Sequence, residues 1–235
     1  MRAAAGGGRT GRFGSLLIAC GLLLVVEACA ETANTTTAPV RPTSTTTTTT
    51  TTTTAPPPTI PEHWVWGVDT VDLGDGYRLG PCSGDADQFA CISRDGALLG
   101  AAERLALPVD TFPALAGVDD PVESIAVIAA DFVTTFSADR QATCPDLAFI
   151  ALEPAQVTVA RTPGLRFGFE ELDGEVVVER VVQYGARIGG NVTLFNFTAI
   201  APGACLAAEG ELTDPAVLDL IGPGLEAVVA VVEPG

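Results

Sequence analysis

A run of ten consecutive threonines, residues 45–54, divides this 235-residue chain and limits where it can fold. The run lies within residues 30–61, where Thr and Pro dominate and large apolar side chains are almost absent. Such a composition cannot bury enough apolar surface to offset the conformational entropy lost on folding. We therefore expect residues 30–61 to be a disordered Thr/Pro-rich stalk. It could carry O-linked sugars, as Thr-rich stalks of exported proteins often do, or be a bare spacer.

The residues before this stalk have the layout of a secretory signal peptide. Arg2, Arg9 and Arg12 are the only charges ahead of an apolar run at 16–26. That run has eleven residues, whereas a membrane-spanning helix needs roughly 20. We expect residues 1–28 to be a cleaved signal peptide rather than a transmembrane anchor.

The end of this leader resembles a bacterial lipobox. Val26, Ala28 and Cys29 match its pattern, and Glu27 occupies a position where a small or apolar residue is usual. The resemblance implies that Cys29 carries a diacylglyceryl group, and two acyl chains suffice for stable membrane attachment. Cys20 is the second candidate for the lipid-bearing residue, and an ordinary signal peptide without lipidation is the alternative interpretation.

The charge of the chain excludes several classes of function. Its net charge is −17, and apart from His63 every basic residue is Arg. This balance argues against nucleic-acid partners and against electrostatic adhesion to anionic lipid. Without Lys there is no Walker-type phosphate loop, Ser–Lys nucleophile or Schiff base. His63 stands at the end of the stalk, where nothing rigid would hold it as a catalytic base. We expect no catalytic residues, no cofactor and no metal site.

Carboxylates remain the only abundant reactive groups, and four gather around an expected hairpin tip: Glu170, Glu171, Asp173 and Glu175. A glycosidase would need two carboxylates with one of them shielded from water. Because a hairpin tip is wet, we interpret these residues as a solvated acidic turn. Asp69, Asp72 and Asp75 are spaced by three and fit a calcium loop poorly, because such loops alternate ligands at two-residue spacing.

Four cysteines follow the stalk: Cys82, Cys91, Cys144 and Cys205. An even number in an exported protein predicts two disulfides, for which three pairings exist. We expect Cys82–Cys91 across a short polar loop and Cys144–Cys205 across the domain. A zinc site is the rival interpretation, but there is no C-x-x-C pair to support it. From the leader and Cys29, we expect a lipid-anchored protein on the outer surface of the cell membrane.

The residues after the linker (29–62), numbered 63–235, are sufficient for one globular domain. Asp120, Pro121 and Glu123 have the spacing of a helix start with a capping box. An apolar stripe then predicts a core-facing helix: Val122, Ile125, Ala126, Ala129, Phe132, Val133 and Phe136. Before it, strands are expected at 64–71, 76–80, 89–93 and 97–107.

After the Cys144-Pro145 pair, the apolar period changes to two. Strands are expected at 149–152, 155–161, 165–172, 175–184, 191–200 and 205–212. Asp173-Gly174 has the composition of a two-residue type I′ hairpin. A last helix begins after Thr213, and Gly222-Pro223-Gly224 should kink or split it. Trp64 and Trp66 would point to one face of a strand, and we expect both to close an edge of the core.

This order of elements predicts an α+β fold, an antiparallel meander covered by a central and a C-terminal helix. The order, the lipobox, the cysteines and the stretch DRQATCP at 139–145 together resemble the PsbP-like sandwich lipoproteins of mycobacterial cell envelopes. The resemblance implies a monomeric, non-catalytic envelope protein that binds a partner protein or a small ligand. The alternatives are a structural or adhesive surface module and a carboxylate-based cell-wall hydrolase.

Overall fold

The computed structural model describes residues 61–205 and 210–233. The expected signal peptide, Cys29 and most of the stalk lie outside these residues. The described elements follow one another as β1 (Val71–Gly74), β2 (Tyr77–Pro81), β3 (Phe89–Arg94), β4 (Ala97–Pro108), η1 (Val109–Thr111), η2 (Pro113–Leu115), α1 (Pro121–Thr143), β5 (Ala148–Val159), β6 (Thr162–Asp173), β7 (Val176–Ile188), β8 (Asn191–Ile200) and α2 (Ala216–Val231).

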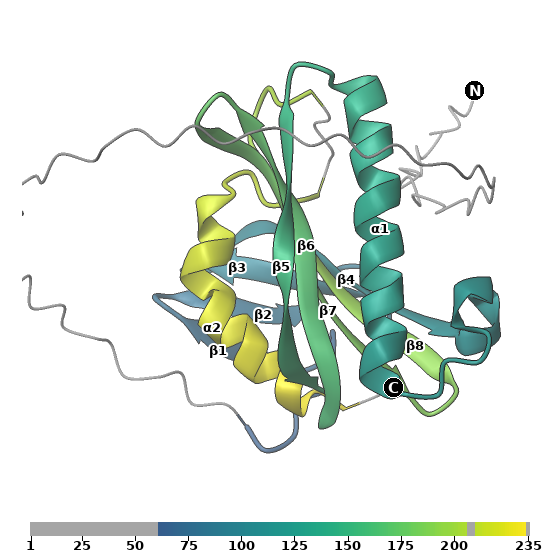
Figure 1. Cartoon of the computed structure of the whole chain (residues 1–235). Coiled ribbons are helices and arrows are strands. Elements are labelled where there is room, and N and C mark those ends of the chain that lie inside the picture. The colour runs from purple at the N-terminus through teal and green to yellow at the C-terminus, as the bar shows by residue number, and fades with distance from the viewer. Residues whose placement is uncertain (1–60, 206–209, 234–235) are drawn as a thin grey trace, which may run out of the picture. The chain divides into compact units, whose positions relative to one another are not determined.

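All the named strands form one antiparallel sheet in the order β1-β2-β3-β4-β8-β7-β6-β5. It consists of two four-stranded meanders that meet where β4 pairs with β8. Helix α1 connects β4 to β5, which lies at the far edge of the second meander (Figure 1). The structure thus confirms the predicted α+β class and the antiparallel meander.

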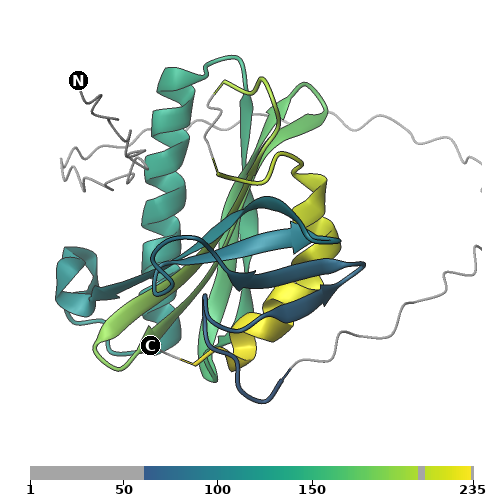
Figure 2. The same cartoon turned by 180° about the vertical axis from the view of Figure 1, so that it is seen from behind.

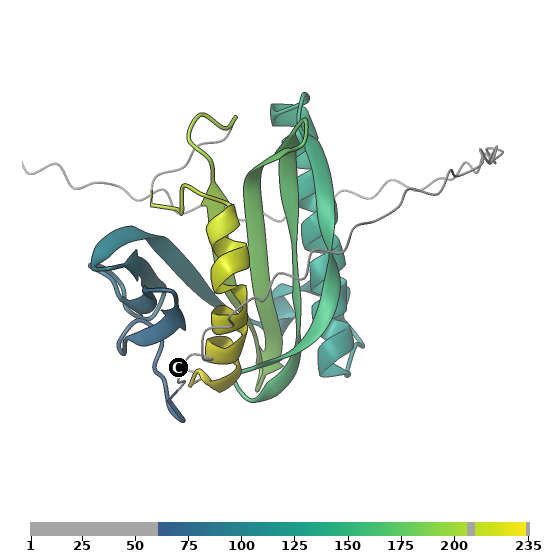
Figure 3. The ribbon, with the colours of Figure 1, turned by 90° about the vertical axis from the view of Figure 1, so that its left-hand side faces the viewer.

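The two helices lie on opposite faces of the sheet. Helix α2 lies on the concave side, between β1–β3 and β5–β7, whereas α1 covers the outer face of β5–β7 (Figures 1 and 3). The view from behind shows β1–β3 crossing over α2 (Figure 2). Each face therefore has its own core. The larger core contains Trp64, Trp66 and the apolar side of α2, and the smaller one contains Ile125 and Phe167.

Local sequence explains where α1 begins. The Asp120 carboxylate accepts hydrogen bonds from the backbone N–H groups of Val122 (2.9 Å) and Glu123 (2.8 Å), as a capping residue should. The buried face differs from the expected stripe, because Ser124 and Ile128 are buried and Ala126 is exposed. By length and composition α1 could span a membrane, but its inner face packs on the sheet instead.

Four predicted strands differ from the structure. Residues 64–70 form a turn with one bridge from Trp64 to Val232, and the first strand begins only at Val71. Residues 149–161 contain a single strand, β5, whose pairing is interrupted by a bulge between Leu152 and Ala155 because Pro154 has no N–H to donate. The expected strand at 205–212 is absent among the described residues, although Leu212 bridges to β8.

Both tryptophans are buried, as expected, although they lie in a turn. Trp64 and Trp66 are 0% and 2% exposed, and the Trp66 ring lies 4.9 Å from that of Phe195. The Trp64 indole N–H donates to the Asp69 carbonyl at 3.0 Å. This turn therefore closes the edge of the larger core.

The β6–β7 hairpin turns one residue later than predicted. Asp173 pairs with Val176, so the two loop residues are Gly174 and Glu175. Gly174 has a φ of 63°, while Glu175 is not among the residues with positive φ. Positive φ at the first loop residue alone is the requirement of a type II′ turn, not of type I′.

Helix α2 is continuous through Gly222-Pro223-Gly224, so the expectation that it splits there is wrong. The two glycines have different environments. A Cβ at Gly224 would lie 2.6 Å from the Leu73 carbonyl oxygen, whereas a Cβ at Gly222 would meet nothing within 4 Å. Gly224 thus allows α2 to approach the backbone of β1, and Gly222 leaves open space beside the helix.

The far end of α2 is tied to the opposite edge of the sheet. The N–H groups of Ala160 and Arg161, in the β5–β6 turn, donate to the carbonyls of Val229 (2.7 Å) and Ala230 (2.8 Å). These carbonyls belong to the last turn of the helix, which has no partners of its own. The turn therefore caps α2.

We expect Gly224→Ala to lower the free energy of unfolding by about 1–3 kcal/mol, because the added methyl group collides with backbone that cannot move aside. Gly222→Ala is the matched control in the same helix. It should raise stability by up to about 1 kcal/mol, because Ala is the better helix former. Urea denaturation of both variants measures the difference, and equal effects would contradict this role of Gly224.

Candidate functional site

A groove of about 850 Å³ runs between α2 and the inner face of β5–β7. Its sheet wall includes Thr158, Arg166 and Tyr184, and its helix wall includes Gly222 and Glu226. The groove stays open at its middle because Gly222 carries no side chain there. The groove thus lies between the sheet and a helix, and both apolar and charged side chains line it.

Two ion pairs connect the groove's walls. Arg180 contacts Glu170 at 2.6 Å, contacts Asp219 on α2 and donates to the Pro215 carbonyl, so its guanidinium is fully used. Arg166 contacts Glu226 by a single 3.4 Å pair in which both side chains are nearly half exposed. The Arg180 contacts are structural, whereas Arg166 is free to exchange Glu226 for a ligand group.

Tyr184 lies beneath the Arg166 pair. Its side chain is buried, and burial raises the pKa of its hydroxyl to about 12, with the nearby Arg166 acting in the opposite direction. The hydroxyl is therefore neutral at any physiological pH and is available as a hydrogen-bond donor or acceptor in the groove.

A second, smaller cavity of about 620 Å³ lies where β4 ends. Phe112, Pro113 and Leu115 contribute most of its apolar lining, and Asp110 is its one charged residue. It has few polar groups to orient a ligand, so the groove beside α2 is the better candidate.

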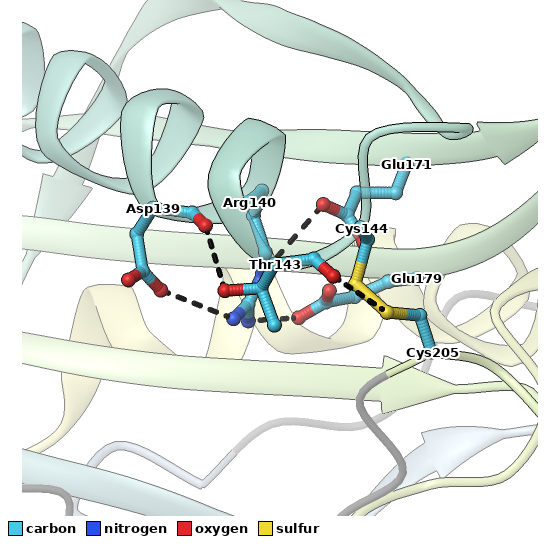
Figure 4. The surroundings of a disulfide bond; sticks show 7 residues. All are labelled: Asp139, Arg140, Thr143, Cys144, Glu171, Glu179 and Cys205. Carbon is cyan, nitrogen blue, oxygen red and sulfur yellow. Dashed lines mark hydrogen bonds and ion pairs between the residues drawn. A yellow bond between two sulfur atoms is a disulfide. The ribbon is translucent and has the colours of Figure 1, made fainter.

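The opposite face of the same hairpin carries a buried cluster of charges. Glu171 on β6 and Glu179 on β7 are directly opposite each other in the sheet, and both are at most 3% exposed. Like charges at such a position repel each other. Arg140, from the last turns of α1, contacts Glu179 at 2.9 Å and Glu171 at 3.6 Å (Figure 4).

A third carboxylate reaches the cluster from a segment that fills a fork in the sheet. Pairing of β4 with β8 ends at Glu103, and residues 210–212 (the fork segment) lie between the strands beyond it. Ala101 N–H donates to the Gly210 carbonyl at 2.8 Å, and Ile200 N–H donates to the Leu212 carbonyl at 2.7 Å. Leu212 enters the larger core, so its neighbour Glu211 points to the other face.

We call Arg140, Glu171, Glu179 and Glu211 the acidic cluster. Several of its buried polar atoms have no hydrogen-bond partner among the described residues: Arg140 Nε, Glu179 Oε2 and Glu211 Oε2, with Gln183 Oε1 close by on β7. Unpartnered buried groups are costly, and a native protein keeps few of them.

Burial is the main cause of the raised pKa values of Glu171 and Glu211. It raises the pKa of Glu171 to about 7, with further increases from the hydrogen bond to Glu179 and from its charge, against an opposing effect of Arg140. Burial likewise raises the pKa of Glu211, helped by Glu179. One carboxyl of the cluster therefore holds a proton in weakly acidic solution.

The structure corrects our interpretation of the acidic hairpin. Glu175 is exposed, as a solvated turn requires, but Glu170 pairs with Arg180 and Glu171 is buried against Arg140. Both glutamates lie within β6, where a helix covers each face of the sheet, so they are packed rather than solvated. Adjacent strand residues must face opposite sides, and this signal could have separated Glu170 from Glu171.

The remaining predicted residues have mainly structural contacts. The disulfides are Cys82–Cys91 and Cys144–Cys205, which is the expected pairing and indicates an extracytoplasmic domain. His63 is exposed and contacts Glu233 at 2.8 Å.

Two aspartates of the spaced set accept hydrogen bonds from nearby backbone N–H groups. Asp69 accepts a bond from Val65 N–H, and Asp72 accepts one from Gly74 N–H. Asp139 forms a local ion pair with its neighbour Arg140 at 3.7 Å. In residues 61–205 and 210–233, no three His, Cys, Asp or Glu side chains are grouped to hold a metal ion.

Comparison with known proteins finds similar solved structures but no family. No protein-family model and no curated protein matches the chain. The solution structure of cyanobacterial PsbP (CyanoP) from Synechocystis sp. PCC 6803 is similar at a TM-score of 0.36 and 14% sequence identity, over 66% of this chain and 84% of that one. The chain thus has a weak structural similarity to PsbP, and we draw no functional argument from it.

We expect Arg140→Met to lower the free energy of unfolding by about 3–5 kcal/mol at pH 7, because it leaves buried carboxylates without a counter-charge. Arg78→Met is the control, since Arg78 is exposed on β2 and has no ion pair in the described part of the chain. Chemical denaturation measures both. A loss below about 1 kcal/mol for Arg140→Met would contradict the role of Arg140 as counter-charge.

Proposed function

We propose that this chain is a non-catalytic, lipid-anchored cell-envelope protein whose extracytoplasmic domain binds a small amphipathic ligand in the groove beside α2. The groove itself is the observation that carries the proposal. Its volume of about 850 Å³ lies within the roughly 300–1,000 Å³ typical of ligand sites. It also combines apolar walls with a few convergent polar groups, which is how such sites fix the orientation of a ligand.

The lining suggests how a ligand would be held. Leu152, Val182 and Leu218 offer apolar contact, and the Tyr184 hydroxyl offers a neutral polar one. Arg166 is the charged group most easily released, because its only ion pair is long and half exposed. An apolar body with a single anionic or hydrogen-bonding end therefore suits the groove.

Two observations make the alternative functions weaker proposals. A sugar-binding adhesive module would need exposed aromatic residues, but the large exposed hydrophobic residues of the described part are all aliphatic. A hydrolase would need two carboxylates facing a cleft. Four carboxylates line the groove, but Glu170 and Asp219 are paired with Arg180, Glu226 is paired with Arg166, and Glu153 is exposed. Glu171 and Glu179 face each other but line neither the groove nor the smaller cavity.

The anchoring part of the proposal rests on the sequence. The basic leader, the apolar run and Cys29 support lipidation, and the Thr/Pro-rich residues that follow would act as a spacer between membrane and domain. The extracytoplasmic disulfides support the same location. The acidic composition makes the lipid, rather than surface charge, the proposed link to the membrane. We propose that the protein acts as a monomer and reaches an envelope partner or ligand from this position.

Binding is tested with 8-anilinonaphthalene-1-sulfonate, a fluorescent probe with an apolar body and one anionic group. We expect saturable binding to the folded protein, and loss of affinity by at least about tenfold in Gly222→Trp, because the indole fills the groove. Gly222→Ala adds only a methyl group and should bind within about twofold of the wild type.

Circular dichroism on the same samples would establish that both variants are folded. Equal binding by the wild type and Gly222→Trp would contradict a ligand site in the groove. Weaker binding by Arg166→Gln, with the exposed Arg78→Gln unchanged, would identify Arg166 as the partner of the anionic end.

Lipidation is tested by the intact mass of protein extracted from bacterial membranes. We expect a chain that begins at Cys29 and carries added diacylglyceryl mass, and we expect Cys29→Ser to lose that mass. Cys20→Ser is the control and should be processed like the wild type. Lipid mass that persists in Cys29→Ser, or an unlipidated chain in the medium, would contradict the anchor.

A further inference from the structure

We propose that the acidic cluster is a proton-binding latch that holds the fork segment and the end of α1 on the sheet in weakly acidic surroundings and loosens them as the pH rises. The inference is independent of the groove, which lies on the other face of the β6–β7 hairpin. It rests on the placement of charges from four separate parts of the chain.

The charges do not balance. Glu171 and Glu179 come from β6 and β7, and Glu211 comes from the fork segment, so three carboxylates share the single guanidinium of Arg140. When all of them are ionised, a buried net negative charge remains, which is among the most unfavourable arrangements in a protein interior. Binding of one proton between the facing glutamates relieves most of it.

Among the described residues that face the cluster, Arg140 is the only cation that acts on these carboxylates. On α1, the neighbour of Arg140 is Asp139, which adds a further negative charge. On β4, Glu103 also acts on Glu211, and Glu103 itself has only the neutral Gln88 as a hydrogen-bond partner, at 2.9 Å. On β7 and β8, the nearby polar groups are the neutral amides of Gln183 and Asn196.

The cluster joins the end of α1, the β6–β7 hairpin and the fork segment, next to the Cys144–Cys205 disulfide. Arg140 stacks over the rings of Phe136 and Phe169 and lies one turn before Cys144, whose N–H donates to the Arg140 carbonyl at 2.7 Å. Glu211 lies in a three-residue segment held by a few backbone hydrogen bonds. The charge state of Glu211 therefore acts on a short segment whose contacts include these hydrogen bonds and the buried Leu212 side chain.

The sign of the pH response follows from the direction of the shifts. The pKa of Glu171 is raised in the folded protein to about 7, from an ordinary value of 4.5, and that of Glu211 is also raised. The folded state therefore holds its proton more tightly than the opened state. The stabilisation is fully present below the ordinary pKa and is lost as the pH rises through about 7. Above that pH, opening the cluster to water costs less free energy than it does in weakly acidic solution.

The test is hydrogen exchange of the full chain at pH 5.5 and pH 8.0, corrected for the intrinsic change of amide exchange rate. In the wild type we expect protection of the amides that hold the fork segment, those of Ala101, Ile200 and Leu212, to fall by at least about tenfold at the higher pH. Amides of the β2–β3 pair, which are remote from the cluster, should change much less.

Glu171→Gln should remove most of this difference, because the amide has nearly the shape of the protonated carboxyl and cannot ionise. Glu175→Gln is the matched control, an exposed glutamate of the same hairpin, and should respond to pH like the wild type. Equal protection at both pH values in the wild type, or an unchanged response in Glu171→Gln, would overturn the proposal.

A second measurement needs no variant. The rate at which a phosphine reductant opens Cys144–Cys205, divided by the rate for Cys82–Cys91 in the same sample, should rise severalfold between the two pH values, because Cys144 becomes accessible when the end of α1 loosens. Because the same reductant attacks both disulfides, the ratio of the two rates removes the pH dependence of the reagent itself. A constant ratio would overturn the latch, as would an NMR titration in which the Glu171 carboxyl titrates near its ordinary pKa.

Discussion

The contact of α2 with both ends of the sheet is the constraint on which the rest of this structure depends. At one end, Gly224 lets the helix touch the backbone of β1, and at the other, the β5–β6 turn donates hydrogen bonds to Val229 and Ala230. A sheet that holds one helix in this way must curve around it. The curvature creates the larger core, and the groove remains along the stretch where Gly222 has no side chain to fill it.

The same curvature explains why charged side chains occur so close to the core. Strand residues alternate between faces, so each polar residue of the β6–β7 hairpin must meet a helix on one side or the other. Glu170 and Arg180 point toward α2 and meet Asp219, whereas Glu171 and Glu179 point toward α1. The Arg180 guanidinium has acceptors for its N–H groups, whereas Arg140 is surrounded by more carboxylates than its single charge can neutralise. The proton is therefore bound in the Arg140 cluster.

Features of the fold that depend on nearby residues could be predicted from the sequence. The Asp120 cap, the helix that follows it and the short loop closed by Cys82–Cys91 all involve neighbours along the chain. Helix α2 shows the limit of such reasoning. Pro223 predicts an interruption, but the missing N–H and the two glycines are accommodated because the helix is held at both ends by the sheet.

The acidic cluster could not be predicted, because it depends on strand register. The hairpin turns at Gly174-Glu175, and only that register brings Glu171 opposite Glu179. A turn one residue earlier would pair different residues, and the two glutamates would not be placed opposite each other. The fork segment adds a contact between Glu211 and elements far away in sequence. Composition indicated an acidic protein with its carboxylates in water, whereas the topology removes a few of them from water and so gives them titration behaviour that exposed carboxylates do not have.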